Sequence, residues 1–147
     1  MRTLVHGFVL WFSLLIAALA PAASAAEPVV PAQSAKAVQL LVRAQLDAFA
    51  TDDAKRAFSY AAATIQQMFG TPDNFMDMVR STYPVVYRPA SVTFLTPKPK
   101  GKVVVQPVHM TDGQGASWLA VYRLEQQKDK SWRIAGCVLV ANGGQSV

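Results

Sequence analysis

The sequence contains a single cysteine, Cys137, and two histidines, His6 and His109. One cysteine cannot form an internal disulfide, even in an oxidising compartment. A zinc or iron site needs several Cys, His or acidic ligands held together, and so few histidines and cysteines do not supply them. We therefore expect no metal and no cofactor. Cys137 itself is expected to be a small buried strand residue rather than a reactive thiol.

Charged residues are also scarce, at 16% of the chain. Of the fourteen lysines and arginines, Arg2 lies in the N-terminal segment, which leaves thirteen basic residues against nine acidic ones in the rest of the chain. This excess of four positive charges is mild and is interspersed with acids. A nucleic-acid partner would require a much more basic surface, so we expect none.

The N-terminal segment has the features of a secretory signal peptide over residues 1–25. Arg2 precedes an apolar run, Phe8–Ala20, and the small residues Ala23-Ser24-Ala25 follow. The run is shorter than the roughly 20 residues that a membrane-spanning helix needs. We therefore expect cleavage before Ala26, and a mature protein that is exported to the periplasm or secreted.

Residues 26–33 contain two prolines and are expected to form a flexible leader, and residues 34–147 are expected to form a single α+β domain. Apolar residues recur at helical spacing from Val38 to Phe49 and predict the first helix. Capping signals predict two further helices, over about 53–63 and 72–81.

Two prolines in Tyr83–Pro89 favour extended backbone, and beyond them the hydrophobic period changes to two. Strands are predicted over 91–96 and 102–110, followed by a hairpin over Ser117–Val140 around the polar connector Gln126–Lys130. The sequence thus predicts an α+β fold in which three N-terminal helices pack on a curved, four-stranded antiparallel meander with a cone-like shape.

The register of the last hairpin depends on the number of residues in its loop. With an even loop, Trp118 and Tyr122 share a face with Cys137. With an odd loop they share it with Trp132 and Ile134, because a shift of one residue exchanges the two faces. The odd register collects the large aromatic residues on one side, and it is the register that we expect.

The order of helices followed by a curved sheet resembles the cone-shaped fold of nuclear transport factor two, ketosteroid isomerase and scytalone dehydratase. The closer resemblance is to a group of exported bacterial domains known as domain of unknown function 4864. It covers nearly all of the chain after the predicted signal peptide, and it rests on Gln45–Phe49 with Asp52–Ala54, Phe75–Arg80 with Tyr83–Pro89, and Trp132–Cys137. The resemblance implies a fold rather than an activity. It also implies a homodimer formed through the open face of the sheet.

Enzymes of the resembled superfamily place a carboxylate or histidine base inside the cone. No acidic residue of this chain lies in mid-strand on an apolar face, where burial would raise its pKa. His109 stands alone near the end of the second predicted strand. We therefore assign no catalytic residue. The alternative, an enzyme of isomerase or dehydratase type, would depend on His109, Tyr83 or Tyr87.

The densest set of polar and aromatic residues lies on the connector between the third helix and the sheet, and it comprises Arg80, Tyr83, Tyr87 and Arg88. Guanidinium and phenol groups suit a small anionic, amphipathic molecule. With Trp118 and Tyr122 of the hairpin beneath them, these residues form the predicted ligand-binding site. In the structural alternative, Arg80 pairs with Asp47 or Asp77 and the tyrosines fill the core.

Five lysines fall in two turns at one end of the predicted meander: Lys98, Lys100, Lys102, Lys128 and Lys130. They would give a weak contact with an anionic membrane surface, or they would simply keep strand edges apart as solvated residues. Taken together, the sequence favours a non-enzymatic periplasmic domain that binds a small molecule or a protein partner. An enzyme and an envelope-interaction module remain the alternatives.

Overall fold

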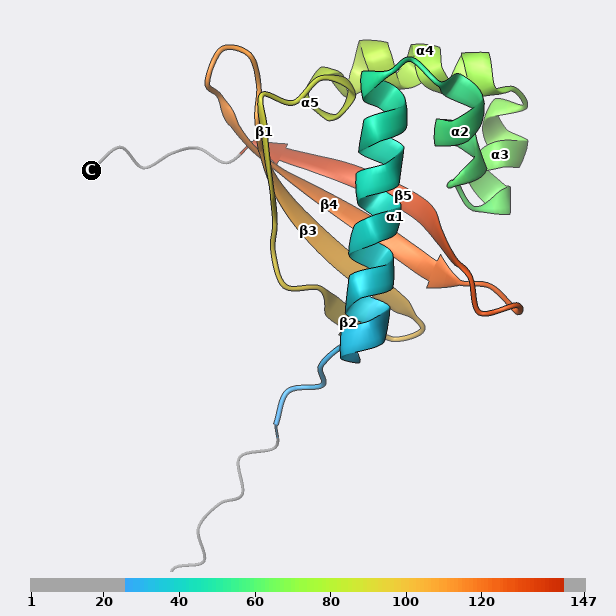
Figure 1. The fold of residues 1–147 in the computed structure, drawn as a ribbon, viewed down its shortest axis with the longest axis vertical. Coiled ribbons are helices and arrows are strands. Elements are labelled where there is room, and N and C mark those ends of the chain that lie inside the picture. The colour runs from blue at the N-terminus through green and yellow to red at the C-terminus, as the bar shows by residue number, and fades with distance from the viewer. Residues whose placement is uncertain (1–25, 142–147) are drawn as a thin grey trace, which may run out of the picture.

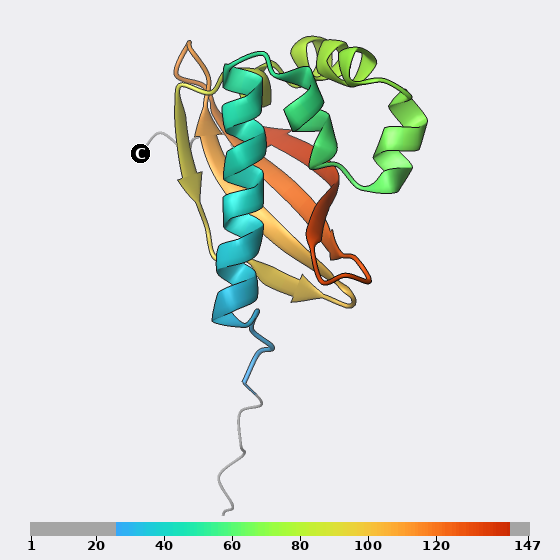
Figure 2. The ribbon, with the colours of Figure 1, turned by 45° about the vertical axis from the view of Figure 1, so that its right-hand side comes forward.

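The computed structural model describes residues 26–141, so the predicted signal peptide lies outside the described residues. The α+β prediction is confirmed: helices cover one face of an antiparallel sheet (Figures 1 and 2). The helices are α1 (Ala32–Ala50), α2 (Ala54–Ser59), α3 (Ala63–Phe69), α4 (Pro72–Thr82) and α5 (Pro84–Tyr87). The strands are β1 (Ser91–Phe94), β2 (Lys98–Lys100), β3 (Val103–Thr111), β4 (Ser117–Gln126) and β5 (Trp132–Ala141).

Helix α1 is the long element that crosses the sheet in Figure 1. It begins at Ala32, directly after Pro31, so the prediction of a flexible leader through residue 33 is wrong by two residues. The helical spacing of its apolar residues is confirmed, because Val38, Val42 and Phe49 are all buried.

The single helix predicted over 53–63 is wrong. Two helices, α2 and α3, flank a short non-helical segment, Tyr60–Ala62, in which Ala61 forms an isolated bridge with Ile134 of β5. The backbone N–H of Ile134 donates to the Tyr60 carbonyl at 2.9 Å, and the N–H of Ala62 donates to the Ile134 carbonyl at 2.8 Å. These two bonds to a residue distant in sequence interrupt the helix, since they use backbone groups that a continuous helix would need.

The predicted helix starts at Asp53 and Thr71 are confirmed. Each side chain accepts a hydrogen bond from the backbone N–H three residues further on, at 3.0 Å for Asp53 and 3.2 Å for Thr71. Pro72 then takes the first position of α4, where its missing N–H costs nothing.

The prediction that residues 83–89 contain no helix is wrong, because Pro84–Tyr87 forms one helical turn, α5. The residues that precede the two prolines do leave the helical region, with φ and ψ of −125° and 55° at Tyr83 and −141° and 72° at Arg88. One turn of helix fits between them, because Pro84 occupies its first position.

The sheet has five strands rather than the predicted four. Its order is β1-β3-β4-β5. Strand β2, which was predicted as a connector, pairs with β3 along the same edge as β1. Along β3 every second residue is buried, which fixes the face that meets the helices. Pro107 is tolerated in this strand because it lies opposite the gap between the end of β1 at Phe94 and the start of β2 at Lys98.

The β4–β5 hairpin combines both registers considered from the sequence. Tyr122 pairs with Cys137, as in the even register, and after a bulge Leu124 pairs with Ile134, as in the odd one. The expectation of a uniform odd register is therefore wrong, because a bulge inserts one residue into β5. Cys137 and Ile134 consequently lie on the same face as Tyr122, while Val138 is 62% exposed.

The core lies wholly within the described residues, between Val38 and Ile134. Within this core, Phe75 of α4 packs among the helices and contacts one phenylalanine on each of α1, α2 and α3. A chain that begins at residue 26 thus carries a complete core of its own and is expected to fold independently. Among the described helices, none is both long and apolar enough to cross a membrane.

Candidate functional site

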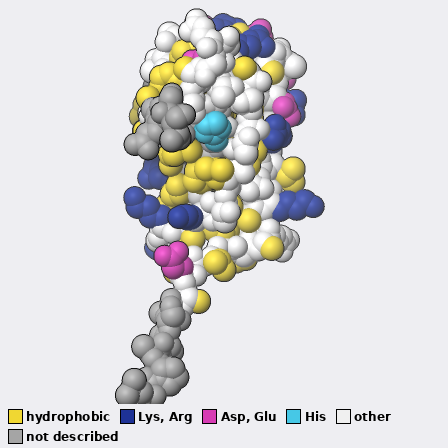
Figure 3. Space-filling view, turned by 90° about the vertical axis from the view of Figure 1, so that its left-hand side faces the viewer, with side chains coloured by type: hydrophobic (Ala, Val, Ile, Leu, Met, Phe, Trp, Pro, Cys, Tyr) yellow, Lys and Arg dark blue, Asp and Glu magenta, His cyan; other side chains and the backbone are white. Residues whose placement is uncertain are grey.

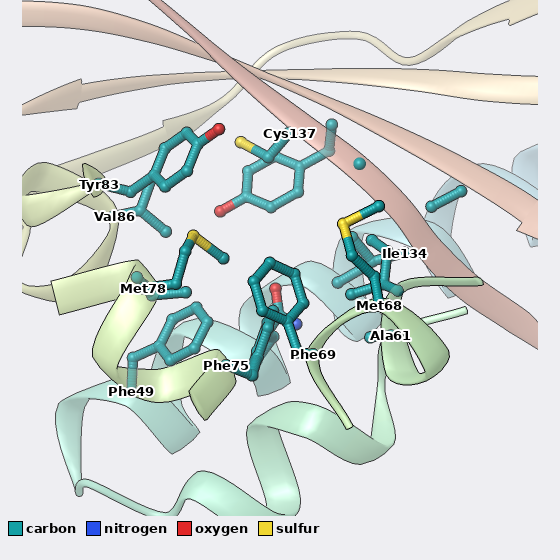
Figure 4. A pocket seen from close by; sticks show the side chains of 16 residues that line it. Phe49, Ala61, Met68, Phe69, Phe75, Met78, Tyr83, Val86, Ile134 and Cys137 are labelled. Atoms are coloured by element: carbon teal, nitrogen blue, oxygen red, sulfur yellow. The ribbon is translucent and has the colours of Figure 1, made fainter. Parts of the chain in front are cut away.

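A cavity of about 290 Å³ lies between the helical layer and β5 (Figure 4). Its wall is mostly apolar, half of the lining residues are aromatic or contain sulfur, and no charged side chain of the described residues lines it. The labelled members in Figure 4 include Phe49, Phe69, Phe75, Met68, Met78 and Cys137. Methionine adapts its shape to what it contacts, so such a wall suits an apolar molecule without a rigid outline.

Helix α3 forms the outer wall of this pocket. It contributes no buried residue, and the side chain of Met68 is 75% exposed although it lines the cavity. The helix is attached through Gln66 at its middle, whose side-chain amide donates to the carbonyls of Phe58 at 3.1 Å and Ala61 at 3.0 Å. At its end, Gly70 adopts a positive φ of 72°, which glycine reaches without strain. Helix α3 is therefore the least packed part of the wall.

Tyr122 supplies an unusual polar group to the pocket wall. The residue is 1% exposed, and its hydroxyl has no hydrogen-bond partner among the described residues. An unsatisfied buried hydroxyl costs about 1–3 kcal/mol of folding free energy. Burial raises the pKa of Tyr122 and raises the pKa of its cross-strand neighbour Cys137 to about 12, so both groups stay protonated at neutral pH. The thiol of Cys137 lies beside the hydroxyl and slightly affects the pKa of both groups, but sulfur is a weak acceptor and no hydrogen bond of normal geometry joins them. Tyr122 is thus a donor without a strong acceptor.

Gln45 is the other buried polar side chain of the wall. Its amide nitrogen donates to the Ala57 carbonyl at 3.1 Å and so joins α1 to α2. This bond gives Gln45 a structural role. The hydroxyl of Tyr122 is left as the fully buried polar group of the pocket that a bound molecule could satisfy, while Tyr83, which also lines the pocket, is only half-buried.

Of the six predicted ligand-binding residues, the structure places Tyr83 and Tyr122 in the pocket wall. In Figure 4 the ring of Tyr83 extends from the α4–α5 junction towards β5. Three others, Arg80, Tyr87 and Arg88, do not line it. They gather instead around Asp52, at the turn between α1 and α2.

The carboxylate of Asp52 accepts hydrogen bonds from Arg80 and Arg88, each at 3.0 Å, and from the hydroxyl of Tyr87. Arg80 also pairs with Asp77 at 3.2 Å, as the structural alternative predicted. Asp52 has a positive φ of 55°, a backbone conformation that residues other than glycine rarely adopt, and the cluster holds it there. The adjacent Asp53, and not Asp52, makes the cap of α2.

The hydrogen bonds from Tyr87 and then from Arg80 hold the pKa of the Asp52 carboxyl below its ordinary value. A group whose pKa is depressed by folding stabilises the fold above the unfolded pKa, near about 4, and loses that contribution as the pH falls through the folded value. We therefore expect Asp52→Asn to lower the melting temperature at pH 7 and to flatten the loss of stability below about pH 4.

Thermal unfolding of both proteins across acidic pH checks this prediction. Asp73→Asn is a suitable control, because Asp73 forms no ion pair among the described residues. An Asp52→Asn protein with the same acid profile as the parent would contradict the role given to the cluster.

Trp118, the sixth predicted ligand-binding residue, lies elsewhere. Its indole N–H donates to the carboxylate of Asp112 at 3.0 Å. With Arg88 and Asp112 it lines a separate, more polar depression between α5 and the β3–β4 turn. The tryptophan therefore does not form the floor of the apolar pocket, although Tyr83 borders both hollows.

His109 lies on the face of the sheet opposite to the helices, because its neighbours Val108 and Met110 are buried in the core. Its Nε2 is hydrogen-bonded to the hydroxyl of Ser117 at 2.6 Å. A histidine and a band of hydrophobic side chains are visible on this side of the molecule in Figure 3. The sheet thus separates His109 from Tyr83, and the two do not converge on one site. Within residues 26–141, no group of three or more potential ligands is arranged to hold a metal ion.

Fold and site together define an α+β domain whose helices enclose an apolar pocket against an antiparallel sheet. The family described as Domain of unknown function (DUF4864) matches residues 31–147, and the chain belongs to this family. The resemblance to domain of unknown function 4864 is thereby confirmed, and export stays a prediction. No curated protein and no solved structure matches the chain. The relationship to the cone fold of nuclear transport factor two stays a prediction.

Proposed function

We propose that this domain binds a small, uncharged, mostly apolar molecule in the pocket between α3, α4 and β5. The observation that carries the proposal is an apolar cavity with a buried tyrosine hydroxyl that lacks an acceptor. Ligand pockets in proteins are typically apolar, with a small number of polar groups that orient the ligand. Tyr122 is suited to that orienting role. Binding without catalysis is the function that this arrangement supports best.

The charges of the site favour a neutral ligand over the anionic one expected from the sequence. Both arginines of the predicted site already share the carboxylate of Asp52. An anion in the apolar pocket would lose its hydration without gaining a counter-charge, which costs several kcal/mol or more. The proposed ligand is therefore apolar except for one neutral hydrogen-bond acceptor, which would pair with the hydroxyl of Tyr122.

The size of the cavity limits the ligand as well. A volume of about 290 Å³ lies at the lower end of the range, roughly 300–1,000 Å³, that is usual for small-molecule sites. One small aromatic or branched aliphatic molecule matches this space. Its route of entry would pass α3, the least packed wall.

We also propose that binding takes place outside the cytoplasm, because residues 1–25 have the pattern of a signal peptide. Cell fractionation of the full chain would test this part. A mature protein that begins near Ala26 in the periplasmic fraction is the expected result, and a full-length cytoplasmic protein would contradict it.

The binding proposal can be tested with N-phenyl-1-naphthylamine, a neutral apolar probe that becomes fluorescent when it leaves water. The chain from residue 26 should bind it saturably. Met78→Trp should weaken binding at least about tenfold, because the indole fills a cavity that Met78 now lines. The matched control is Leu40→Trp, an exposed position on α1 outside this pocket, which should bind like the parent. Equal binding by the parent and Met78→Trp would contradict the site.

A further inference from the structure

A second feature, independent of the pocket, lies at the end of the sheet that carries the β2–β3 and β4–β5 turns. We call it the basic end, and it consists of Lys98, Lys100, Lys102, Lys128 and Lys130. We propose that the basic end binds the surface of an anionic phospholipid bilayer.

Strand register brings the two groups of lysines together. Lys100 pairs with Val103 across the β2–β3 turn, and Val103 pairs with Glu125 of β4, which then leads into the turn at 127–131. The β2–β3 turn and the β4–β5 turn therefore lie next to each other, because β3 and β4 are neighbouring strands of the sheet. In both ribbon views they lie at the same end of the molecule as the start of α1 (Figures 1 and 2).

The basic end carries an excess of exposed positive charge. All five lysines are exposed. Every ion pair formed among the described residues involves Arg80 or Arg88 near Asp52, so none of the five lysines has one. Asp129 and Glu125 lie near the lysines and accept hydrogen bonds from neutral groups of the turn, Asp129 from Ser131 at 2.9 and 2.6 Å and Glu125 from Gln127 at 3.4 Å. They keep their charges, so the five lysines leave an excess of three positive charges over these two acids. Like charges so gathered repel one another and favour a polyanionic partner.

Two observations favour a lipid surface over another polyanion. First, the chain enters the domain at this end, where Val29, 82% exposed, lies just ahead of α1 (Figures 1 and 2). Second, Leu95, 42% exposed, precedes Lys98 by three residues and places an apolar side chain next to the lysines. Apolar and basic side chains together suit the interface of an anionic bilayer.

The test uses the chain from residue 26 with vesicles of phosphatidylcholine alone or with added phosphatidylglycerol. We expect sedimentation with the anionic vesicles only, and its loss at high salt, because salt screens exposed charges. Lys100→Gln with Lys128→Gln should weaken the affinity roughly ten- to thirtyfold, since each lysine near an anionic surface contributes about a fivefold factor. The matched control, Lys55→Gln with Arg56→Gln, removes the same charge from α2 at the other end of the molecule and should bind like the parent.

Other results would overturn the proposal. These are equal binding to neutral vesicles, no binding to anionic vesicles, an equal loss in the α2 control, or binding to heparin without binding to vesicles. The pocket does not enter this test: Met78→Trp should bind the vesicles like the parent, so a failure of either proposal leaves the other standing.

Discussion

Replacement of Phe75 by alanine is expected to lower the free energy of unfolding by about 3–5 kcal/mol. The ring is 6% exposed and lies 6.1 Å from Phe49, 5.5 Å from Phe58 and 5.6 Å from Phe69, measured between ring centroids. These partners belong to α1, α2 and α3, so one side chain of α4 connects its helix to the three helices that precede it. Its loss leaves a hole that extends the existing pocket, which Phe75 lines.

Urea denaturation followed by circular dichroism would measure this loss. Phe75→Leu retains most of the buried volume and should cost less than about 2 kcal/mol. A cost below about 1 kcal/mol for Phe75→Ala would show that the helical layer does not depend on this aromatic cluster.

Tyr122→Phe is expected to change stability and binding in opposite directions. It removes a buried hydroxyl that has no partner, so the free energy of unfolding should rise by about 1 kcal/mol. The same change removes the donor for the ligand. Affinity for 6-propionyl-2-(dimethylamino)naphthalene, a neutral probe with a carbonyl acceptor, should therefore fall about tenfold, while N-phenyl-1-naphthylamine should bind as before.

The matched control for this prediction is Tyr60→Phe. The hydroxyl of Tyr60 accepts a hydrogen bond from Arg56 at 3.1 Å on the surface, so its removal should change stability by less than about 0.5 kcal/mol and leave both probes unaffected. A Tyr122→Phe protein that is destabilised by 1 kcal/mol or more would mean that the hydroxyl is satisfied in the folded state, and the reason for placing an acceptor beside it would disappear.

Local chemistry made much of the fold predictable. The spacing of Val38 and Val42, the caps at Asp53 and Thr71, and the alternation along β3 depend on residues close in sequence, and the structure confirms all of them. The errors arise from pairing between distant segments. Nothing near Tyr60–Ala62 indicates that Ile134 will take its backbone hydrogen bonds, and the bulge in β5 depends on how that strand packs rather than on its loop length.

The candidate site shows the same limit. Arg80, Tyr87 and Arg88 stand out in the sequence as a group of donors, but their acceptor, Asp52, lies about 30 residues upstream and resembles a helix cap. Tyr122 could be predicted to face the helices once the register was known. That its hydroxyl has no acceptor is a property of the assembled wall, and no sequence pattern reports it.

The most direct test of the binding proposal is an NMR titration of the chain from residue 26 with methionine methyl groups labelled with carbon-13. Met68 and Met78 line the pocket, whereas Met110 is buried in the core and does not line it. On addition of N-phenyl-1-naphthylamine, the methyl signals of Met68 and Met78 should shift in a saturable way and that of Met110 should stay in place. Unchanged signals from Met68 and Met78 at saturating probe would contradict the account.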